Sequence, residues 1–234
     1  MTPVPFFKEG DSEIHSGDSV KLIPWLECGD TLVSDPPYGT EVEADGYGRR
    51  QNYGGVGRKI AGDSDLRAFA AVMAMVTCSK AAVFASPKRE HEVVLLLELI
   101  GWEVVHQAVW DKGIPGLGGG IRYQHECILF ATRGKWSGAC GMSSVLRVTS
   151  DSRGGIHPHA KPVALMGMIL DYCGAKHVID PFAGTGATLL AAKARGIRYT
   201  GIELEPDYCA HAKKQLAQEE LFATVEPVEE QTLL

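Results

Sequence analysis

The chain has 234 residues, of which 45% are hydrophobic, and a formal net charge of −6. This length suits one domain with a sizeable buried core, and no domain boundary is visible. No apolar stretch reaches the roughly 18 residues of a membrane helix, and the six cysteines lack the paired spacing of a zinc site or a disulfide framework. We therefore expect a cytoplasmic protein with no membrane partner and no metal.

Short β-rich runs alternate with helical ones, which predicts an α/β fold with a mostly parallel sheet and helices on both faces. Seven strands are expected at residues 13–15, 31–34, 81–85, 104–110, 127–132, 177–179 and 199–202. Helices are expected at residues 65–77, 91–100, 162–172, 187–195 and 206–221. These elements predict a single domain over residues 1–217, followed by an acidic tail at 218–234.

Three glycine-rich segments separate these elements, at residues 39–62, 113–121 and 134–157. Loops of such length in a compact domain are usually functional, so we expect them to contact a substrate. Between residues 112 and 162, seven basic residues stand against two acidic ones, which makes this part of the chain the best candidate for contacting phosphate groups. The alternative is that these charges merely keep an irregular surface soluble.

The first motif is Asp35-Pro36-Pro37-Tyr38, which follows the predicted strand at 31–34. An exocyclic amine of a nucleic-acid base is a poor nucleophile, because its lone pair is delocalised into the ring. A carboxylate and backbone carbonyls stiffened by two prolines can accept its hydrogens from fixed positions, and the tyrosine ring can stack on an extruded base. The motif therefore predicts a site for an amino group, with a surface turn as the alternative.

The second motif is Asp180-Pro181-Phe182-Ala183-Gly184-Thr185-Gly186, which joins a predicted strand to a predicted helix. Its glycines allow a ligand to approach the backbone closely, and Glu203, at the end of the next strand, can accept hydrogen bonds from ribose hydroxyls. Leu189 stands where a dinucleotide fingerprint would have its third glycine. The unit therefore favours a smaller nucleoside ligand; a purely structural glycine turn would leave Asp180 and Glu203 unexplained.

Together these motifs resemble those of the S-adenosylmethionine-dependent DNA amino-methyltransferases, which carry D-P-P-Y and D-P-F-x-G-x-G. Their order along the chain resembles the beta group, a circularly permuted arrangement of that family. Further segments agree at residues 14–18, 110–112, 125–130 and 157–162, so the resemblance spans residues 13–216. It implies a Rossmann-like class I methyltransferase fold with a seven-stranded, mostly parallel sheet in which one strand is antiparallel.

The resemblance also implies roles for individual residues. The residues expected to be catalytic are Asp35, Pro36, Pro37 and Tyr38. The residues expected to bind S-adenosylmethionine are Asp18, Asp35, Lys161, Asp180, Phe182, Ala183, Gly184, Thr185, Gly186, Glu203 and Leu204. The loop at 39–62 is expected on the catalytic side, and the segment at 133–157 replaces the family's longer target-recognition insert. The residues expected to contact DNA are Arg49, Arg50, Arg58, Lys112, Arg122, Arg147 and Arg153.

The implied reaction is methylation of a flipped adenine at N6 in double-stranded DNA, because D-P-P-Y is more typical of adenine enzymes and S-P-P-Y of cytosine-N4 enzymes. Methylation of cytosine N4, methylation of RNA adenine and a non-catalytic protein that retains the cofactor fold stay open as alternatives. The implied enzyme would be bacterial or phage-encoded, with a homodimer and a cognate restriction nuclease as candidate partners. The short recognition segment predicts a short or relaxed target sequence.

Overall fold

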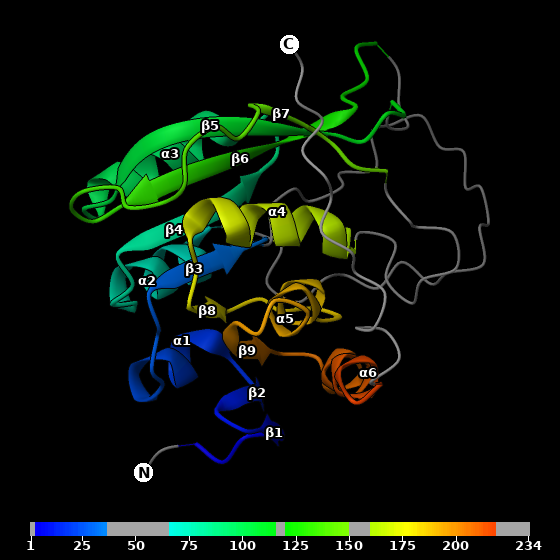
Figure 1. Ribbon diagram of the computed structural model, residues 1–234. Helices are drawn as coiled ribbons and strands as arrows, with labels where there is room; N and C mark the ends of the chain where they lie inside the picture. Colours follow the sequence, from blue (N-terminus) through cyan, green and yellow to red (C-terminus); the bar gives the residue numbers. More distant parts are fainter. Residues whose placement is uncertain (1–2, 37–65, 116–119, 150–159, 219–234) are drawn as a thin grey trace, which may run out of the picture.

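A computed structural model describes residues 3–36, 66–115, 120–149 and 160–218, which form a nine-stranded sheet covered by helices on both faces (Figure 1). The strands are β1 (Phe7–Glu9), β2 (Ser12–Ser16), β3 (Thr31–Ser34), β4 (Lys80–Ala85), β5 (Glu103–Asp111), β6 (His125–Thr132), β7 (Val145–Arg147), β8 (His177–Asp180) and β9 (Arg198–Glu203). The helices are α1 (Ser19–Leu22), the 3-10 turn η1 (Ile23–Trp25), α2 (Arg67–Met75), α3 (Glu90–Leu99), α4 (Val163–Cys173), α5 (Ala187–Lys193) and α6 (Pro206–Leu216). The predicted α/β architecture is confirmed.

The sheet has the strand order β1-β2-β9-β8-β3-β4-β6-β5-β7. All seven expected strands form, and among them β6 alone runs antiparallel to its neighbours β4 and β5. The expected count of seven is nevertheless too low, because β1 and β7 add a short strand at each edge, and β1 is a second antiparallel strand. Each added strand has only three residues, too few to show a hydrophobic period in the sequence.

The two sequence motifs leave the sheet from adjacent strands. β3 pairs with β8 in parallel, with Thr31 opposite Val178 and Leu32 opposite Ile179. From β3 the chain continues through α2 to β4 on one side, whereas from β8 it continues through α5 to β9 on the other. Chains that diverge in this way leave a crevice at the carboxyl ends of the two strands, which is where open α/β sheets bind ligands. Asp35 and Asp180 lie at that edge.

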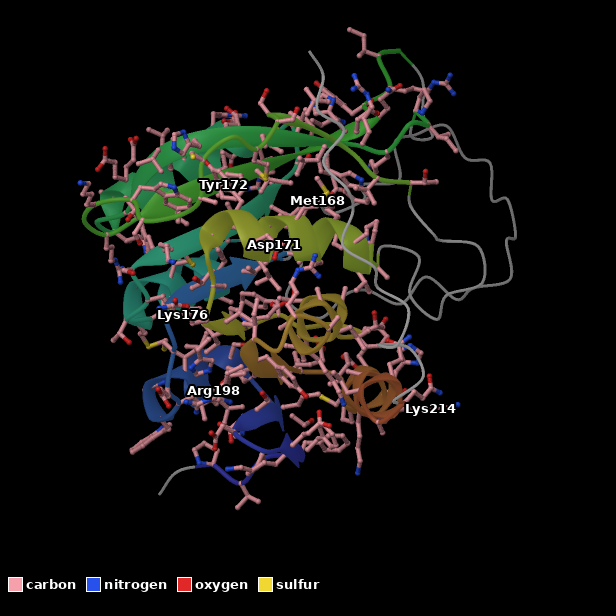
Figure 2. All side chains as sticks on the ribbon, viewed as in Figure 1. Met168, Asp171, Tyr172, Lys176, Arg198 and Lys214 are labelled. Carbon is pink, nitrogen blue, oxygen red and sulfur yellow. The ribbon has the colours of Figure 1, made fainter. Side chains whose placement is uncertain are left out.

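Two apolar layers hold the helices against the sheet. The layer with α4, α5 and α6 is built around Leu165 and Ile169, and the opposite layer, with α1, α2 and α3, around Phe69 and Leu97. On α4, Met168 and Asp171 lie on the outer side of the helix (Figure 2). No helix in the described ranges is long and apolar enough to cross a membrane.

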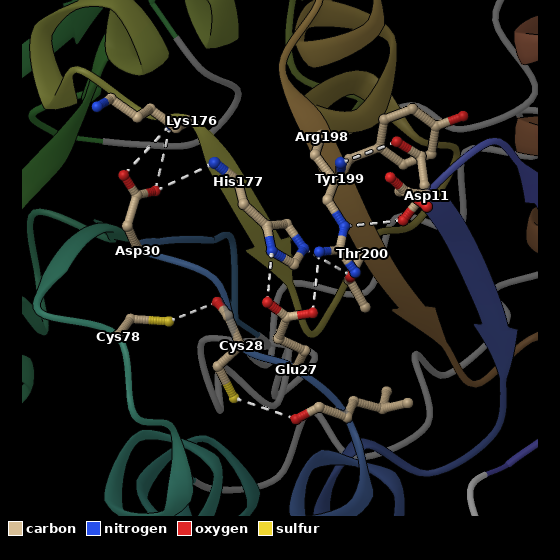
Figure 3. A network of polar contacts seen from close by, with 12 residues as sticks. Asp11, Glu27, Cys28, Asp30, Cys78, Lys176, His177, Arg198, Tyr199 and Thr200 are labelled. Carbon is tan, nitrogen blue, oxygen red and sulfur yellow. Dashed lines mark hydrogen bonds and ion pairs between the residues drawn. The ribbon is translucent and has the colours of Figure 1, made fainter.

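Polar contacts join the amino ends of β3, β8 and β9, at the ends of these strands that lie away from the crevice (Figure 3). The Asp30 carboxylate accepts hydrogen bonds from the backbone N–H groups of Lys176 and His177, each at 3.2 Å. The His177 ring nitrogen Nε2 lies 2.9 Å from Oγ1 of Thr200 in β9. These contacts join the starts of three neighbouring strands, so they also fix where the strands end at the crevice.

Arg133, one of the seven basic residues considered for phosphate contact, is part of the fold. Its guanidinium donates to the backbone carbonyls of Val76 at 2.6 Å and Met73 at 2.9 Å, at the carboxyl end of α2. It also lies over the ring of Trp102, 4.4 Å from the centroid. Carbonyls in the last turn of a helix have no partner within the helix, so Arg133 satisfies acceptors that α2 leaves open.

Replacing Arg133 with methionine should lower the free energy of unfolding by about 2 kcal/mol, because hydrogen bonds from a charged donor to two carbonyls are lost. Urea denaturation measures this change. Arg147→Met is the matched control, since the Arg147 side chain is 79% exposed and its 3.8 Å contact with Asp111 should contribute little. Equal losses in both variants would contradict the structural role of Arg133.

Candidate active site

The Asp35 carboxylate is the first polar group beyond the end of β3, and it forms an ion pair with Lys161. The Oδ2 atom of Asp35 accepts a hydrogen bond from the Lys161 ammonium. Lys161 lies directly before Pro162, the residue that caps the amino end of α4, and its side chain is only 6% exposed. The fold therefore joins two residues that are far apart in the sequence, and it places both at the mouth of the crevice.

A second carboxylate, that of Glu126, contacts the same ammonium. Its Oε2 lies 3.1 Å from Lys161 Nζ, and its Oε1 lies 3.2 Å from Lys112 Nζ. Because β6 runs antiparallel to β4, the first residues of β6 reach the edge at which the other central strands end. Asp35, Lys161, Glu126 and Lys112 thus form one charge cluster of alternating sign.

The cluster keeps its buried members ionised. Burial by itself would lower the pKa of the Lys161 ammonium, but the attraction of Asp35 and Glu126 outweighs it, so the pKa is raised. Burial would raise the pKa of Glu126, yet the two lysines hold it below the usual range. Lys161 also lies 5.0 Å from the centroid of the Phe84 ring, whose face favours a cation.

On the other side of the crevice, Asp180 organises the glycine-rich turn. Its Oδ1 accepts from the backbone N–H of Phe182 at 3.1 Å, and its Oδ2 accepts from the Thr188 hydroxyl at 2.5 Å. Burial raises the pKa of this carboxyl to about 7, and the nearby charges of Asp35 and Glu203 add to the shift. Asp180 is only 3% exposed, so it shapes the turn from inside.

Glu203, at the end of β9, is fixed by the same turn. Its Oε2 accepts from the backbone N–H of Gly184 and its Oε1 from that of Glu205, both at 2.8 Å. Burial raises the pKa of the Glu203 carboxyl. A carboxylate oxygen can accept more than one hydrogen bond, so this arrangement holds Glu203 in one orientation with acceptor capacity remaining for a ligand.

The expected segment at residues 14–18 joins this side of the crevice. The backbone N–H of Gly17 donates to the carbonyl of Glu203 at 2.8 Å, and the Ser19 hydroxyl donates to the carbonyl of Pro181. Asp18 caps α1 by accepting from the backbone N–H of Val20 at 3.0 Å. Three segments that are distant in sequence therefore meet beside Glu203.

The two glycines of the turn are required for different reasons. Both have a left-handed backbone, with φ of 53° at Gly184 and 89° at Gly186. A Cβ atom on Gly184 would meet nothing within 4 Å, whereas one on Gly186 would lie 2.9 Å from the Cβ of Ala212 in α6. Gly186 therefore also permits close helix packing, and Gly184 leaves open space where a ligand can approach the backbone.

The structure places some expected site residues and not others. Phe182, Ala183 and Thr185 lie in the turn, and Leu204, directly after Glu203, is 48% exposed. Lys112, Arg122 and Arg147 lie at or beyond the carboxyl ends of β5 and β7, at the same edge as Asp35. The expected residues outside the described ranges are Pro37, Tyr38, Arg49, Arg50, Arg58 and Arg153.

Glu126 belongs to the charge cluster, although the sequence indicated no role for it within the segment at residues 125–130. The only local signal is an acidic residue at the start of a strand whose remaining residues are fully buried. Charged residues are rarely buried unless they are paired, so such a position indicates a specific partner without identifying it.

Known proteins are similar to this chain in sequence and in fold. Residues 30–214 match a family model, N6_N4_Mtase, described as DNA methylase. The chain is 29% identical to the protein YubD of Escherichia coli (strain K12) over 217 residues, which cover 88% of this chain and 90% of YubD. It is 24% identical to the Type II methyltransferase M2.LlaDCHI of Lactococcus lactis subsp. cremoris, over 91% of each chain.

Solved structures agree in fold. A crystal structure of the M1.HpyAVI–SAM complex superposes with a TM-score of 0.64 and 24% identity, covering 86% of this chain and 98% of that one. The PvuII DNA methyltransferase, described as cytosine-N4-specific, gives a TM-score of 0.69 at 14% identity, covering 92% and 89%. The fold is therefore that of the class I methyltransferases. Within that class, the chain belongs to the DNA methylase family of N6 and N4 amino-methyltransferases.

The raised pKa of Asp180 predicts a specific pH dependence of stability. Between about pH 4 and pH 7 the folded state keeps a proton on this carboxyl that the unfolded state has released. The contribution of Asp180 to stability is therefore most favourable at low pH and decreases as the pH rises through that window. Asp180→Asn removes this dependence, so the variant should gain stability relative to the wild type from pH 4 to 7, by roughly 3 kcal/mol.

Thermal and urea unfolding at several pH values measure this difference. Asp171→Asn, on the outer side of α4, controls for the loss of an aspartate elsewhere in the fold. Wild-type and Asp180→Asn stability curves that run parallel between pH 4 and 7 would contradict the burial of an ionisable group in the turn.

Proposed function

We propose that this protein transfers a methyl group from S-adenosylmethionine to the exocyclic N6 of adenine in double-stranded DNA. The observation that supports this most strongly is the pairing of β3 with β8, which places Asp35 beside the Asp180 turn and Glu203. An acceptor for an amine and a binding unit for a nucleoside thus share one crevice. Membership of the DNA methylase family supports the same reaction.

The cofactor supplies a methyl group activated by a sulfonium. On this chain, Glu203 would accept hydrogen bonds from the ribose hydroxyls, and the turn around Gly184 would lie against the ligand with its open space. The surrounding residues that we assign to the cofactor site are Asp18, Asp35, Lys161, Asp180, Phe182, Ala183, Thr185, Gly186 and Leu204. Their fit rests on the acceptor capacity of Glu203 and on the space at Gly184.

Asp35 would act on the target amine as a hydrogen-bond acceptor. By accepting a hydrogen bond from the amine it would draw the nitrogen toward tetrahedral geometry, so that the lone pair can form the new N–C bond as the S–C bond breaks. The methylated nitrogen then carries a positive charge and releases one proton, which Asp35 would accept and pass to water. Pro36 is buried and has no N–H, which keeps the backbone after Asp35 stiff. By resemblance we assign the flat face for the flipped base to Tyr38 and a second rigid position to Pro37.

DNA would approach from the edge where β5 and β7 end. Lys112, which belongs to the charge cluster, lies there together with Arg122 and Arg147. They would contact phosphates, which position a duplex without reading its sequence. Arg49, Arg50, Arg58 and Arg153 are assigned to the same task from the sequence alone.

Adenine is preferred over cytosine because the motif is D-P-P-Y, with an aspartate in the first position. The relatives leave both bases open: the family model spans N6 and N4 enzymes, and the PvuII enzyme has the same fold and is cytosine-N4-specific. Nucleoside analysis of methylated DNA distinguishes the two, since N6-methyldeoxyadenosine and N4-methyldeoxycytidine differ in mass and retention.

Methyl transfer from tritiated S-adenosylmethionine onto duplex DNA, duplex RNA and protein tests the proposal. Asp35→Ala should lower kcat on DNA by about 100-fold or more. The affinity for the cofactor, measured by isothermal titration calorimetry, should fall much less than kcat, because the Asp180 turn and Glu203 keep their hydrogen bonds without Asp35. Label on RNA or protein but not on DNA would contradict the proposal, and so would an Asp35→Ala variant that still methylates DNA.

A further inference from the structure

The charge cluster contains one more carboxylate than the methyl transfer requires. Asp35 suffices as the acceptor for an amine, yet Glu126 also contacts the Lys161 ammonium, at 3.1 Å, and is itself only 17% exposed. A buried carboxylate is costly unless its interactions compensate for lost hydration. The position of Glu126 therefore suggests a function in the site, beyond folding.

We propose that Glu126 is a positioning residue, which holds Lys161 against Asp35 and balances the charge of the two lysines beside the reacting methyl group. The inference rests on the proposed function, since Asp35 is taken as the acceptor for the target amine. Glu126 need not touch the base or the cofactor for this role. It acts through Lys161, and Lys112 connects it to the edge at which DNA would approach.

The first part of the argument is geometric. Among the described residues, Lys161 contacts groups from three elements: Asp35 after β3, Glu126 at the start of β6 and the Phe84 ring on β4. The two carboxylates fix the ammonium from two sides, and the ammonium in turn fixes Oδ2 of Asp35. Without Glu126, one of these two anchors is lost, and the orientation of the Asp35 carboxylate is less restricted.

The second part is electrostatic. The formal charges of two carboxylates and two lysines make the charge cluster neutral overall. Neutralising Glu126 would leave it with one excess positive charge, next to the place where a sulfonium must meet the amine that Asp35 holds. The excess positive charge would repel the sulfonium, and this repulsion is stronger at short distance and in surroundings of low dielectric constant. Glu126 would therefore favour the charged methyl donor over its neutral product, S-adenosylhomocysteine.

Two variants change the cluster charge in opposite directions and separate this role from a merely structural one. Glu126→Gln removes a negative charge and raises the net charge of the cluster by one unit, whereas Lys112→Met removes a positive charge and lowers it by one unit. Titration calorimetry gives the affinity of each variant for S-adenosylmethionine and for S-adenosylhomocysteine. We expect the preference for S-adenosylmethionine to fall by about threefold or more in Glu126→Gln and to rise in Lys112→Met. A change of the same direction in both variants, or in neither, would overturn the proposal.

Titration of Lys161 tests the same contact without any methyl transfer. In protein labelled with ¹³C at lysine Cε, with the signal assigned by comparison with Lys161→Arg, the pKa of Lys161 should be lower in Glu126→Gln than in the wild type by about one unit or more. Glu126→Asp should restore most of the wild-type value, and it also serves if Glu126→Gln does not fold. Glu92→Gln removes an ion pair with Arg89 on α3 and should leave Lys161 unchanged. An unchanged Lys161 titration in both Glu126 variants would overturn the proposal.

The turnover of the same variants separates the two proposals. Glu126→Gln should lower kcat on duplex DNA by about tenfold, and Glu126→Asp should recover activity. A wild-type protein that methylates no DNA, but shows the expected Lys161 titration and cofactor preference, would contradict the proposed function and leave the contact intact. Full activity in Glu126→Gln would overturn the positioning role and leave the proposed function standing.

Discussion

The parallel pairing of β3 with β8 is the constraint on which the site depends. It brings the end of one strand, with Asp35, next to the end of another, with Asp180, although 145 residues separate them. The chain then diverges from these two strands in opposite directions, which opens the crevice between them. The Asp30 carboxylate joins the start of β8 to the residue before β3. These hydrogen bonds fix the position of β8 relative to β3 along the strand direction, and with it the positions of both motifs at the other ends of the strands.

The two halves of the crevice differ in chemical character. On one side, buried polar groups fix a turn and an acceptor. Asp180 accepts a hydrogen bond from within the turn, and Glu203 accepts one from the backbone N–H of Gly184 in the turn and one from that of Glu205. On the other side, Asp35 and Glu126 both contact the Lys161 ammonium, so the charges alternate in sign. In both halves the acidic side chains are held before any ligand arrives, which is the form of preorganisation that favours electrostatic catalysis.

The sequence alone could predict the elements with strong local patterns. Most of the seven expected strands were predictable because their apolar runs lie between polar turns, although β2 contains only one apolar residue, Ile14. The five longer helices were found to within a few residues, except that α6 ends at Leu216 and not at residue 221. The edge strands β1 and β7 and the short α1 have three or four residues each, so they depend on hydrogen bonds from neighbours. Such elements leave little periodic signal.

The site residues likewise include some that the sequence could predict and some that it could not. Asp35, Asp180 and Glu203 stand in motifs whose residue types match their chemistry, and the structure brings them to one crevice. Glu126 could not be placed from the sequence, because its proximity to Lys161 requires β6 to run against its neighbours. Arg133 shows the converse: its basic charge suggested a phosphate contact, whereas its hydrogen bonds to the end of α2 give it a place in the fold.

The most direct measurement is single-molecule sequencing, with nucleoside mass spectrometry, of DNA from cells that express this chain or its Asp35→Ala variant. The expected result is N6-methyladenine at a short or relaxed target sequence with the wild type, and none above background with the variant. Unmodified DNA from the wild type, or methylation that persists in Asp35→Ala, would contradict the assignment of Asp35 and its crevice as a DNA adenine methylation site.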